Sequence, residues 1–266
     1  MQTIVIDGLP VAALTDWTPE PAACAYSFPK AALEAHPAVA ARWFADGQFR
    51  TRFGPFLIGH RILVDCGVGP GDNAYFPTAQ GKLPAQLAAA GSSLEAVTDV
   101  VLTHLHVDHV GWAPFLPNAR FHVAETEWAH WRQGASAGLP HHTAAVAACI
   151  APLAAAGRLR AVTPDGPLLP GLRFLPAPGH TPGHQAVLLR EHLLIAGDAW
   201  HNPAQIAVPA WCHRADMDPA AAIRSRIRLA EEAVMQDWLV AAGHFTAPFG
   251  RITLDADNAS FVPISD

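Results

Sequence analysis

The stretch THLHVDHVG, residues 103–111, gathers more metal-binding side chains than any other part of the chain. Six consecutive residues hold four potential ligands, His104, His106, Asp108 and His109. Alternate side chains share a face in an extended segment, so His104 and His106 are expected to point together, while Asp108 and His109 lie past a bend. The spacing therefore predicts two metal half-sites rather than one.

The segments around this stretch predict an α+β fold. FGPFLIGHRILVDCG (53–67) is typical of a β-hairpin, and TDVVLT (98–103) of a buried strand that ends at His104. Further strands are predicted at 119–123, 159–162, 173–175, 185–190, 192–198 and 237–244, and helices at 82–91, 125–133, 142–156 and 218–236. Strands dominate each half of the chain and helices follow them. This order favours two packed β-sheets with helices outside, rather than an open parallel sheet.

Composition narrows the class of protein. The 266 residues are 51% hydrophobic, which suits a single domain spanning 1–266. The net charge is −6 and no basic stripe occurs, so nucleic acid is not an expected partner. No apolar run reaches membrane-spanning length and no signal peptide is evident, so we expect a cytoplasmic protein with no membrane partner. The four scattered cysteines form no CxxC pair and suggest no thiolate site.

Two metal ions need more ligands than one short segment provides. Candidates stand at three later strand ends: His184 after the turn PGHTPGH, Asp198 closing LLIAGD, and His244 closing LVAAGH. Asp198 follows small residues that allow close approach, which suits a carboxylate bridging two cations. His180, inside the Pro-Gly turn, is expected to fix the turn rather than to bind metal.

The ligand chemistry predicts a hydrolase. Neutral imidazole and carboxylate suit zinc, iron or manganese, and two divalent ions, with zinc preferred, are expected per chain. Two such ions lower the pKa of a bridging water from about 15.7 toward about 7, which makes a hydroxide nucleophile available. Consistently, no GxSxG serine motif occurs. A metal-stabilised binding module is disfavoured, because structural zinc sites are usually closed and mononuclear.

Together, THLHVDHVG, PGHTPGH, AGD and AAGH resemble the motifs of the metallo-β-lactamase superfamily, from about Phe53 to His244. The resemblance implies an αββα four-layer sandwich with the metals at the edge between the sheets. It implies one metal on His104, His106 and His184, a second on Asp108, His109 and His244, and Asp198 on both. It also implies that Asp65, at the end of the strand ILVD, is a buried aspartate near the site.

The segments GDAWHNPAQIAVPAW (197–211) and AAGHFTAPFGRI (241–252) look most like the branch of N-acyl-homoserine lactonases and methyl parathion hydrolase. The resemblance implies cleavage of lactones or related small esters, namely arylesters and phosphotriesters. Lactonases place a tyrosine three residues after the bridging aspartate, whereas this chain has His201. We expect His201 and Asp108 to be catalytic. The alternative within the superfamily is a mononuclear-iron or dinuclear thioester hydrolase, or a sulfur dioxygenase.

Aromatic residues beside the ligand motifs predict the substrate pocket. These are Trp112, Phe115, Trp200 and Phe245, which are expected to bind substrate together with His201. The loops 17–55 and 134–142 carry no motif, so the natural substrate stays open. A homodimer is expected, formed through an exposed apolar N-terminal segment.

Overall fold

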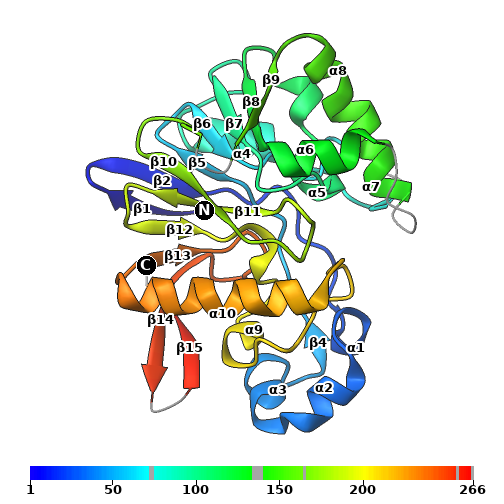
Figure 1. Cartoon of the computed structure of the whole chain (residues 1–266), viewed down its shortest axis with the longest axis vertical. Helices are drawn as coiled ribbons and strands as arrows, with labels where there is room; N and C mark the ends of the chain where they lie inside the picture. The colour runs from blue at the N-terminus through cyan, green and yellow to red at the C-terminus, as the bar shows by residue number, and fades with distance from the viewer. Residues whose placement is uncertain (72–74, 134–139, 164–165, 256–257, 265–266) are drawn as a thin grey trace.

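The computed structural model describes residues 1–71, 75–133, 140–163, 166–255 and 258–264. Within them, a seven-stranded and a six-stranded sheet face each other, and helices cover their outer faces (Figure 1). The predicted α+β sandwich of four layers is confirmed.

The first sheet has the strand order β1-β2-β5-β6-β7-β8-β9. Pairing is antiparallel from β1 to β6 and parallel from β6 to β9. The strands are β1 (Gln2–Ile6), β2 (Leu9–Ala13), β5 (Phe56–Ile58), β6 (Ile62–Val64), β7 (Asp99–Val101), β8 (Arg120–Ala124) and β9 (Leu159–Val162). The helices of this half are α4 (Leu83–Ala89), α5 (Val107–Val110), η1 (Ala113–Phe115), α6 (Glu125–Arg132), α7 (Pro140–Ala145), the π-helical η2 (Val146–Ile150) and α8 (Ala151–Ala155).

The second sheet has the order β10-β11-β12-β13-β14-β15, with only β12 and β13 parallel among its described pairs. Its strands are β10 (Leu172–Pro176), β11 (Gln185–Leu189), β12 (Leu193–Ile195), β13 (Leu239–Ala241), β14 (Phe249–Asp255) and β15 (Asn258–Pro263). The associated helices are η3 (Gly197–Ala199), α9 (Ala204–Ala207) and α10 (Pro219–Met235). Asp218 caps α10 by accepting a hydrogen bond from the Ala221 amide at 3.0 Å.

Successive side chains of the short strands point alternately to the outer helices and to the space between the two sheets. In β7, Val100 packs with the outer helices, whereas Val101 belongs to the apolar layer between the sheets. In β12, Leu194 packs with residues of α10, whereas Ile195 faces the first sheet. Because both faces are buried at these positions, Val100 and Val101 of β7 and all of β12 are apolar.

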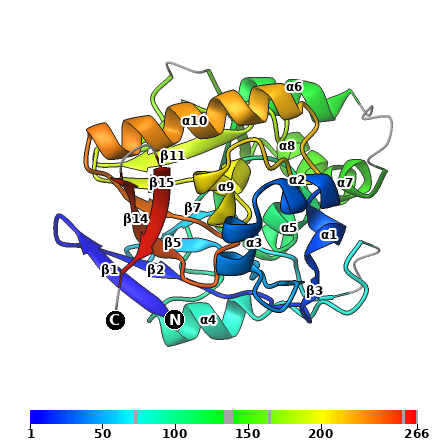
Figure 2. The same cartoon turned by 90° about the horizontal axis from the view of Figure 1, so that it is seen from below.

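Residues 17–55, expected to be an unconstrained loop, contain regular structure. They include the pair β3 (Ala22–Ala23) and β4 (Gln48–Phe49) and the helices α1 (Cys24–Ser27), α2 (Lys30–Ala35) and α3 (Pro37–Trp43). This segment lies beside α9 (Figure 2) and packs Phe28 and Phe44 on Trp211. It therefore forms a cap whose apolar cluster is shared with Ala204, Val208 and Trp211.

The N-terminal segment differs from its prediction. It forms the hairpin β1–β2 at the edge of the first sheet, where Val11 and Leu14 are buried. The segment is therefore exposed only in part: Met1 and Val5 are exposed, whereas Ile6 is buried. The chain ends lie together, since Gln2 Nε2 donates to the Ile264 carbonyl at 3.1 Å.

Two further predictions are modified. The helix predicted at 142–156 is a run of three helical pieces, α7, η2 and α8. Of the connection predicted at 134–142, residues 134–139 lie outside the described residues, and α7 begins at Pro140.

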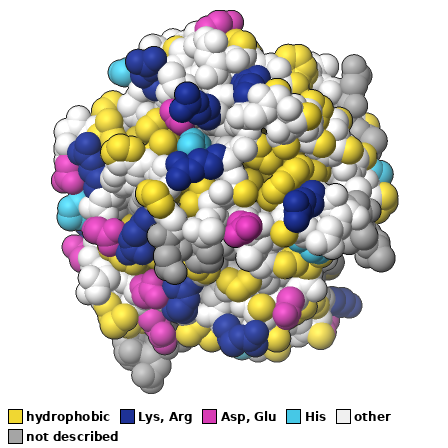
Figure 3. Space-filling model, turned by 45° about the horizontal axis from the view of Figure 1, so that its top comes forward, with side chains coloured by type: hydrophobic (Ala, Val, Ile, Leu, Met, Phe, Trp, Pro, Cys, Tyr) yellow, Lys and Arg dark blue, Asp and Glu magenta, His cyan; other side chains and the backbone are white. Residues whose placement is uncertain are grey.

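Figure 3 shows basic, acidic and hydrophobic side chains interspersed on one face of the molecule. Among the described residues, no helix combines the length and apolar character needed to cross a membrane.

Candidate metal centre

Polar residues of the site follow the ends of strands in both sheets. Asp65 follows β6 and His104 follows β7, while Asp198 and His244 follow β12 and β13. Parallel neighbours end at the same sheet edge, so each parallel pair delivers two side chains to one place. The site therefore lies where the two sheets meet.

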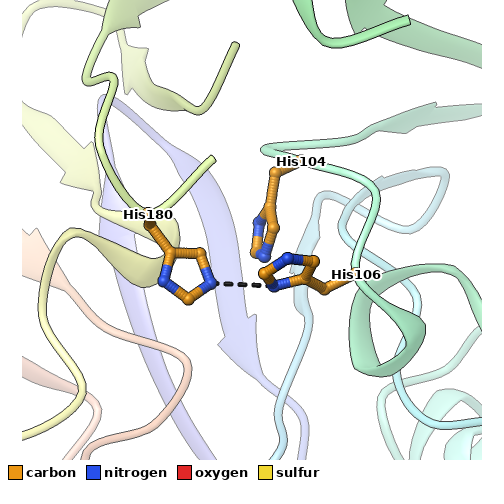
Figure 4. Close-up of side chains that lie close together, drawn as sticks. All are labelled: His104, His106 and His180. Atoms are coloured by element: carbon orange, nitrogen blue, oxygen red, sulfur yellow. Dashed lines mark hydrogen bonds between the residues drawn. The ribbon is translucent and has the colours of Figure 1, made fainter. Parts of the chain in front are cut away.

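Three histidines form a first group. His180 Nε2 lies 2.9 Å from His106 Nδ1, and the His104 ring lies 4.6 Å from that of His106, centroid to centroid (Figure 4). The three rings offer ligand atoms within 4.8 Å of one another. Burial lowers the pKa of His104 and of His106 well below the ordinary value, which keeps both imidazoles neutral and able to donate a lone pair.

A second group combines two carboxylates and two histidines, Asp108, His109, Asp198 and His244. Asp198 Oδ1 lies 3.2 Å from His109 Nε2 and 3.1 Å from His244 Nε2. Its other oxygen, Oδ2, lies 3.2 Å from His180 Nε2 of the first group. One carboxylate thus presents its two oxygens to two different groups.

Several polar atoms at the centre are buried without a hydrogen-bond partner. Among the described residues these include His104 Nε2, His109 Nε2 and Asp198 Oδ1. Buried polar atoms are rarely left unsatisfied, because the desolvation cost is then uncompensated. The donor set of imidazole nitrogens and carboxylate oxygens fits divalent cations of the zinc type.

Comparison with known proteins bears on this arrangement. A family model described as "Metallo-beta-lactamase superfamily" matches residues 56–244. The chain belongs to the metallo-beta-lactamase superfamily. The predicted resemblance is thereby confirmed.

The chain is also similar to individual curated proteins and solved structures. An N-acyl homoserine lactonase from Bacillus thuringiensis is 26% identical over 173 residues, which cover 63% of each chain. The chain thus spans less than two thirds of that relative. The hydrolase AbOPH of the beta lactamase superfamily shares the fold with a TM-score of 0.86 and 23% identity, covering 99% of this chain and 97% of that one. AidC, a dizinc quorum-quenching lactonase, has a TM-score of 0.82 at 22% identity, covering 100% and 97%.

The two histidines of the turn PGHTPGH lie in different surroundings. His184, the predicted ligand, lies outside the groups described above: its Nδ1 is 3.0 Å from the Ala177 carbonyl and its Nε2 accepts from the Asp198 amide at 2.9 Å. Both ring nitrogens are therefore engaged by backbone. His180, expected only to fix the turn, is the histidine that points to His104 and His106.

Buried carboxylates orient two of the histidines. Asp65 Oδ2 lies 2.8 Å from His109 Nδ1, and Asp65 also accepts from the Thr103 amide at 2.8 Å. Asp216, which the sequence did not single out, lies 3.1 Å from His180 Nδ1 and pairs with buried Arg226 at 2.5 Å. Such partners fix the ring orientation and tautomer of a metal-binding histidine.

The charges around His180 determine its protonation. Burial lowers its pKa, but the Asp198 and Asp216 carboxylates outweigh burial and raise the pKa to about 9. Without a metal, His180 is therefore protonated at neutral pH.

A cavity of about 280 Å³ opens beside the two groups. Its floor includes His106, Asp108, Asp198 and His244. Its aromatic wall comes from elsewhere in the sequence: Trp17, Tyr26, Phe49, Phe53, Tyr75 and Phe76. Within the described residues, this wall belongs mainly to the cap of residues 17–55 and the loop before α4.

His201 lies in the cavity wall. Its Nε2 is 3.2 Å from Asp198 Oδ2, and its ring stacks at 3.9 Å on that of His213. Burial lowers the pKa of His201 to about 4, so the imidazole is neutral at neutral pH. With His180 and Asp198 it also forms a third cluster of potential ligand atoms, which was not anticipated.

The other four predicted substrate-binding residues, Trp112, Phe115, Trp200 and Phe245, are not among the described residues that line this cavity. Trp112 is buried in the apolar core between the first sheet and its outer helices, and its Nε1 donates to Asp16 at 3.0 Å. Phe115 is 47% exposed and contacts Trp112 instead. Trp200 and Phe245 are buried in the core between the second sheet and α10. A position next to a metal-ligand motif in sequence does not place a side chain in the cavity, because successive side chains point in different directions.

Proposed function

We propose that this chain is a dinuclear hydrolase that cleaves lactones or related small esters, including arylesters and phosphotriesters, with two divalent ions that are zinc. The observation that carries the proposal is the placement of Asp198, whose oxygens face two separate groups of histidines beside an aromatic cavity. We further propose that residues 1–266 work as one hydrolase domain, because the cavity takes walls from both halves of the chain.

His104, His106 and His180 would hold one ion, and Asp108, His109 and His244 the other, with Asp198 shared. The proposed ligand set thus replaces the predicted His184 by His180. When bound, the ions supply a water of lowered pKa and polarise a C=O or P=O group.

Asp108 is proposed as a catalytic residue as well as a ligand. It faces the cavity and lies 3.4 Å from His109 Nε2. Burial raises its pKa, but the nearby His109 contributes to a net lowering, so the carboxylate is ionised at neutral pH. An ionised carboxylate at the cavity floor is suited to take a proton during attack and to return it to the leaving oxygen.

His201 is proposed to donate a hydrogen bond to the substrate oxygen that gains charge. It is neutral and lines the cavity, and its Nε2, which lies 3.2 Å from Asp198 Oδ2, is the nitrogen that carries the proton. A neutral imidazole carries one N–H donor. The aromatic wall favours an uncharged acyl or aryl group over a strongly charged one.

The names of similar proteins support ester cleavage, since the curated relative is called an N-acyl homoserine lactonase and a structural neighbour a dizinc lactonase. The test is a substrate panel on zinc-reconstituted protein, covering lactones of several chain lengths, aryl esters, phosphotriesters and thioesters. Chelator-sensitive turnover of lactones or of the other oxygen esters is expected. Turnover confined to thioesters, with one redox-active iron per chain, would instead support the thioester hydrolase or sulfur dioxygenase alternative.

A further inference from the structure

One fully buried carboxylate outside the proposed ligand set touches both loops that form the first group of histidines. Glu127, on α6, has no exposed surface. Its Oε1 accepts from the Leu105 amide at 2.9 Å and from Trp131 Nε1 at 2.7 Å. Its Oε2 accepts from Thr181 Oγ1 at 2.7 Å and from the Gly183 amide at 3.0 Å. Four donors thus converge on one side chain.

The donors to Glu127 lie next to the histidines of the first group in sequence. Leu105 stands between His104 and His106, and Thr181 directly follows His180. The first loop leaves the first sheet after β7, whereas the turn leaves the second sheet after β10. Glu127 therefore joins the two segments whose separation sets the 2.9 Å contact between His180 and His106.

The turn also packs tightly against α6. A Cβ added to Gly183 would lie 2.2 Å from the Glu127 amide nitrogen, so the backbone of the turn contacts the start of the helix directly. On the other side of the turn, a Cβ on Gly179 would lie 2.1 Å from the Ala222 nitrogen of α10. The turn that carries His180 is thus held between two helices, and Glu127 supplies the polar contacts on the α6 side.

We infer that Glu127 is a positioning residue that fixes His180 relative to His104 and His106 and thereby sets the affinity of the first metal site. The inference rests on the proposed dinuclear function. A purely structural role for Glu127 would affect the stability of the metal-free protein and not one metal site in particular.

Replacement of Glu127 by glutamine should weaken the hydrogen bonds at Oε2 and keep those at Oε1. The Leu105 amide and the Trp131 indole can only donate, so the glutamine oxygen must face them. Its NH2 group then faces Thr181, whose hydroxyl can accept, and the Gly183 amide, which cannot. Glu127→Gln should therefore loosen the turn of His180 while the loop of His104 and His106 stays held.

The experiment is a titration of metal-free protein with Zn²⁺ in competition with a chromophoric chelator. In Glu127→Gln, one of the two dissociation constants should rise roughly 10- to 100-fold, the range for losing a partner behind a ligand, and the other should stay near the wild-type value. Glu125→Gln, the same change at an exposed position of α6, should leave both constants unchanged.

Thr181→Val provides a second variant if Glu127→Gln folds poorly. It removes one donor to Oε2 with little change in shape and should weaken the same ion, whereas Thr181→Ser, which keeps the hydroxyl, should restore the affinity. Thermal unfolding of each metal-free variant separates loss of fold from loss of binding.

Two results would overturn the inference: wild-type affinity for both ions in Glu127→Gln and Thr181→Val, or equal weakening of both ions that follows the loss of thermal stability. A wild-type protein that binds a single ion would contradict the dinuclear function but not the role of Glu127. The effect of Glu127→Gln would then be measured on the dissociation constant of that one ion.

Discussion

Nδ1 of His180 lies 3.1 Å from Oδ1 of Asp216, and this contact turns the opposite nitrogen of the ring toward His106. Asp216 is itself held by buried Arg226 at 2.5 Å. A carboxylate placed in this way selects one tautomer and one orientation of the imidazole. Asp216 therefore holds the His180 ring with Nε2 facing the first group of histidines.

The same contact predicts proton release when the metal binds. The pKa of His180, lowered by burial but raised further by Asp198 and Asp216, is about 9, whereas a metal needs the deprotonated ring. Protons compete with zinc below this pKa, so zinc affinity should rise with pH and level off near pH 9. Affinity measured by chelator competition from about pH 6.5 to about pH 9.5 checks this, and a constant affinity over that range would contradict it.

Trp112 should matter for stability rather than for substrate. Its indole donates to buried Asp16, which also accepts from the Val68 amide at 2.7 Å. Trp112→Phe removes one donor from a buried carboxylate and should lower the free energy of unfolding by about 1 to 3 kcal/mol. Urea unfolding measures this loss, and kcat/KM should stay within about twofold of wild type. A large kinetic loss at unchanged stability would restore Trp112 to the pocket.

Phe53 should bind substrate through its apolar surface. It lines the cavity, stacks on Trp17 at 5.2 Å and meets His244 edge-on at 5.0 Å. Phe53→Ala should raise KM roughly 10- to 100-fold, because a lost aromatic contact is worth about 1.5 to 3 kcal/mol. The control is Phe115→Ala, at an exposed position outside the described cavity walls, which should leave KM unchanged. Equal effects of both changes would argue against this wall.

His201 should decide between substrate classes. His201→Ala should lower kcat/KM by roughly 10- to 1,000-fold, the range for losing one donor at a developing oxyanion, with metal content unchanged. His201→Tyr should shift the ratio of lactone to aryl-ester or phosphotriester turnover toward lactones. Loss of an ion in His201→Ala would show that His201 is a ligand, as its cluster with His180 and Asp198 permits.

The parts of the site that are local in sequence were predictable, and the rest were not. The run His104 to His109 carries its own spacing, and β12 is marked by consecutive apolar residues. The helices α6 and α10 also agree with the predicted 125–133 and 218–236 to within one residue at each end. These features depend on neighbours along the chain.

Contacts across the fold left no comparable signal. Glu127 and Thr181 are 54 residues apart, and nothing in either segment announces their pairing. His180 and His184 lie in one turn, so only the backbone path decides which faces the site. The aromatic wall comes from residues 17–55 and 75–76, which are far in sequence from the ligand motifs. Only the folded chain brings them to the site.

The count of metal ions tests the central claim most directly. Because Asp198 faces both groups and His244 only one, elemental analysis under saturating zinc should find two ions per chain in the wild type, one in His244→Ala, and neither ion bound tightly in Asp198→Ala. Activity should disappear with the ions on chelation. A wild-type protein with one tightly bound zinc, or an Asp198→Ala variant that keeps two ions and full rate, would contradict the dinuclear centre proposed for this chain.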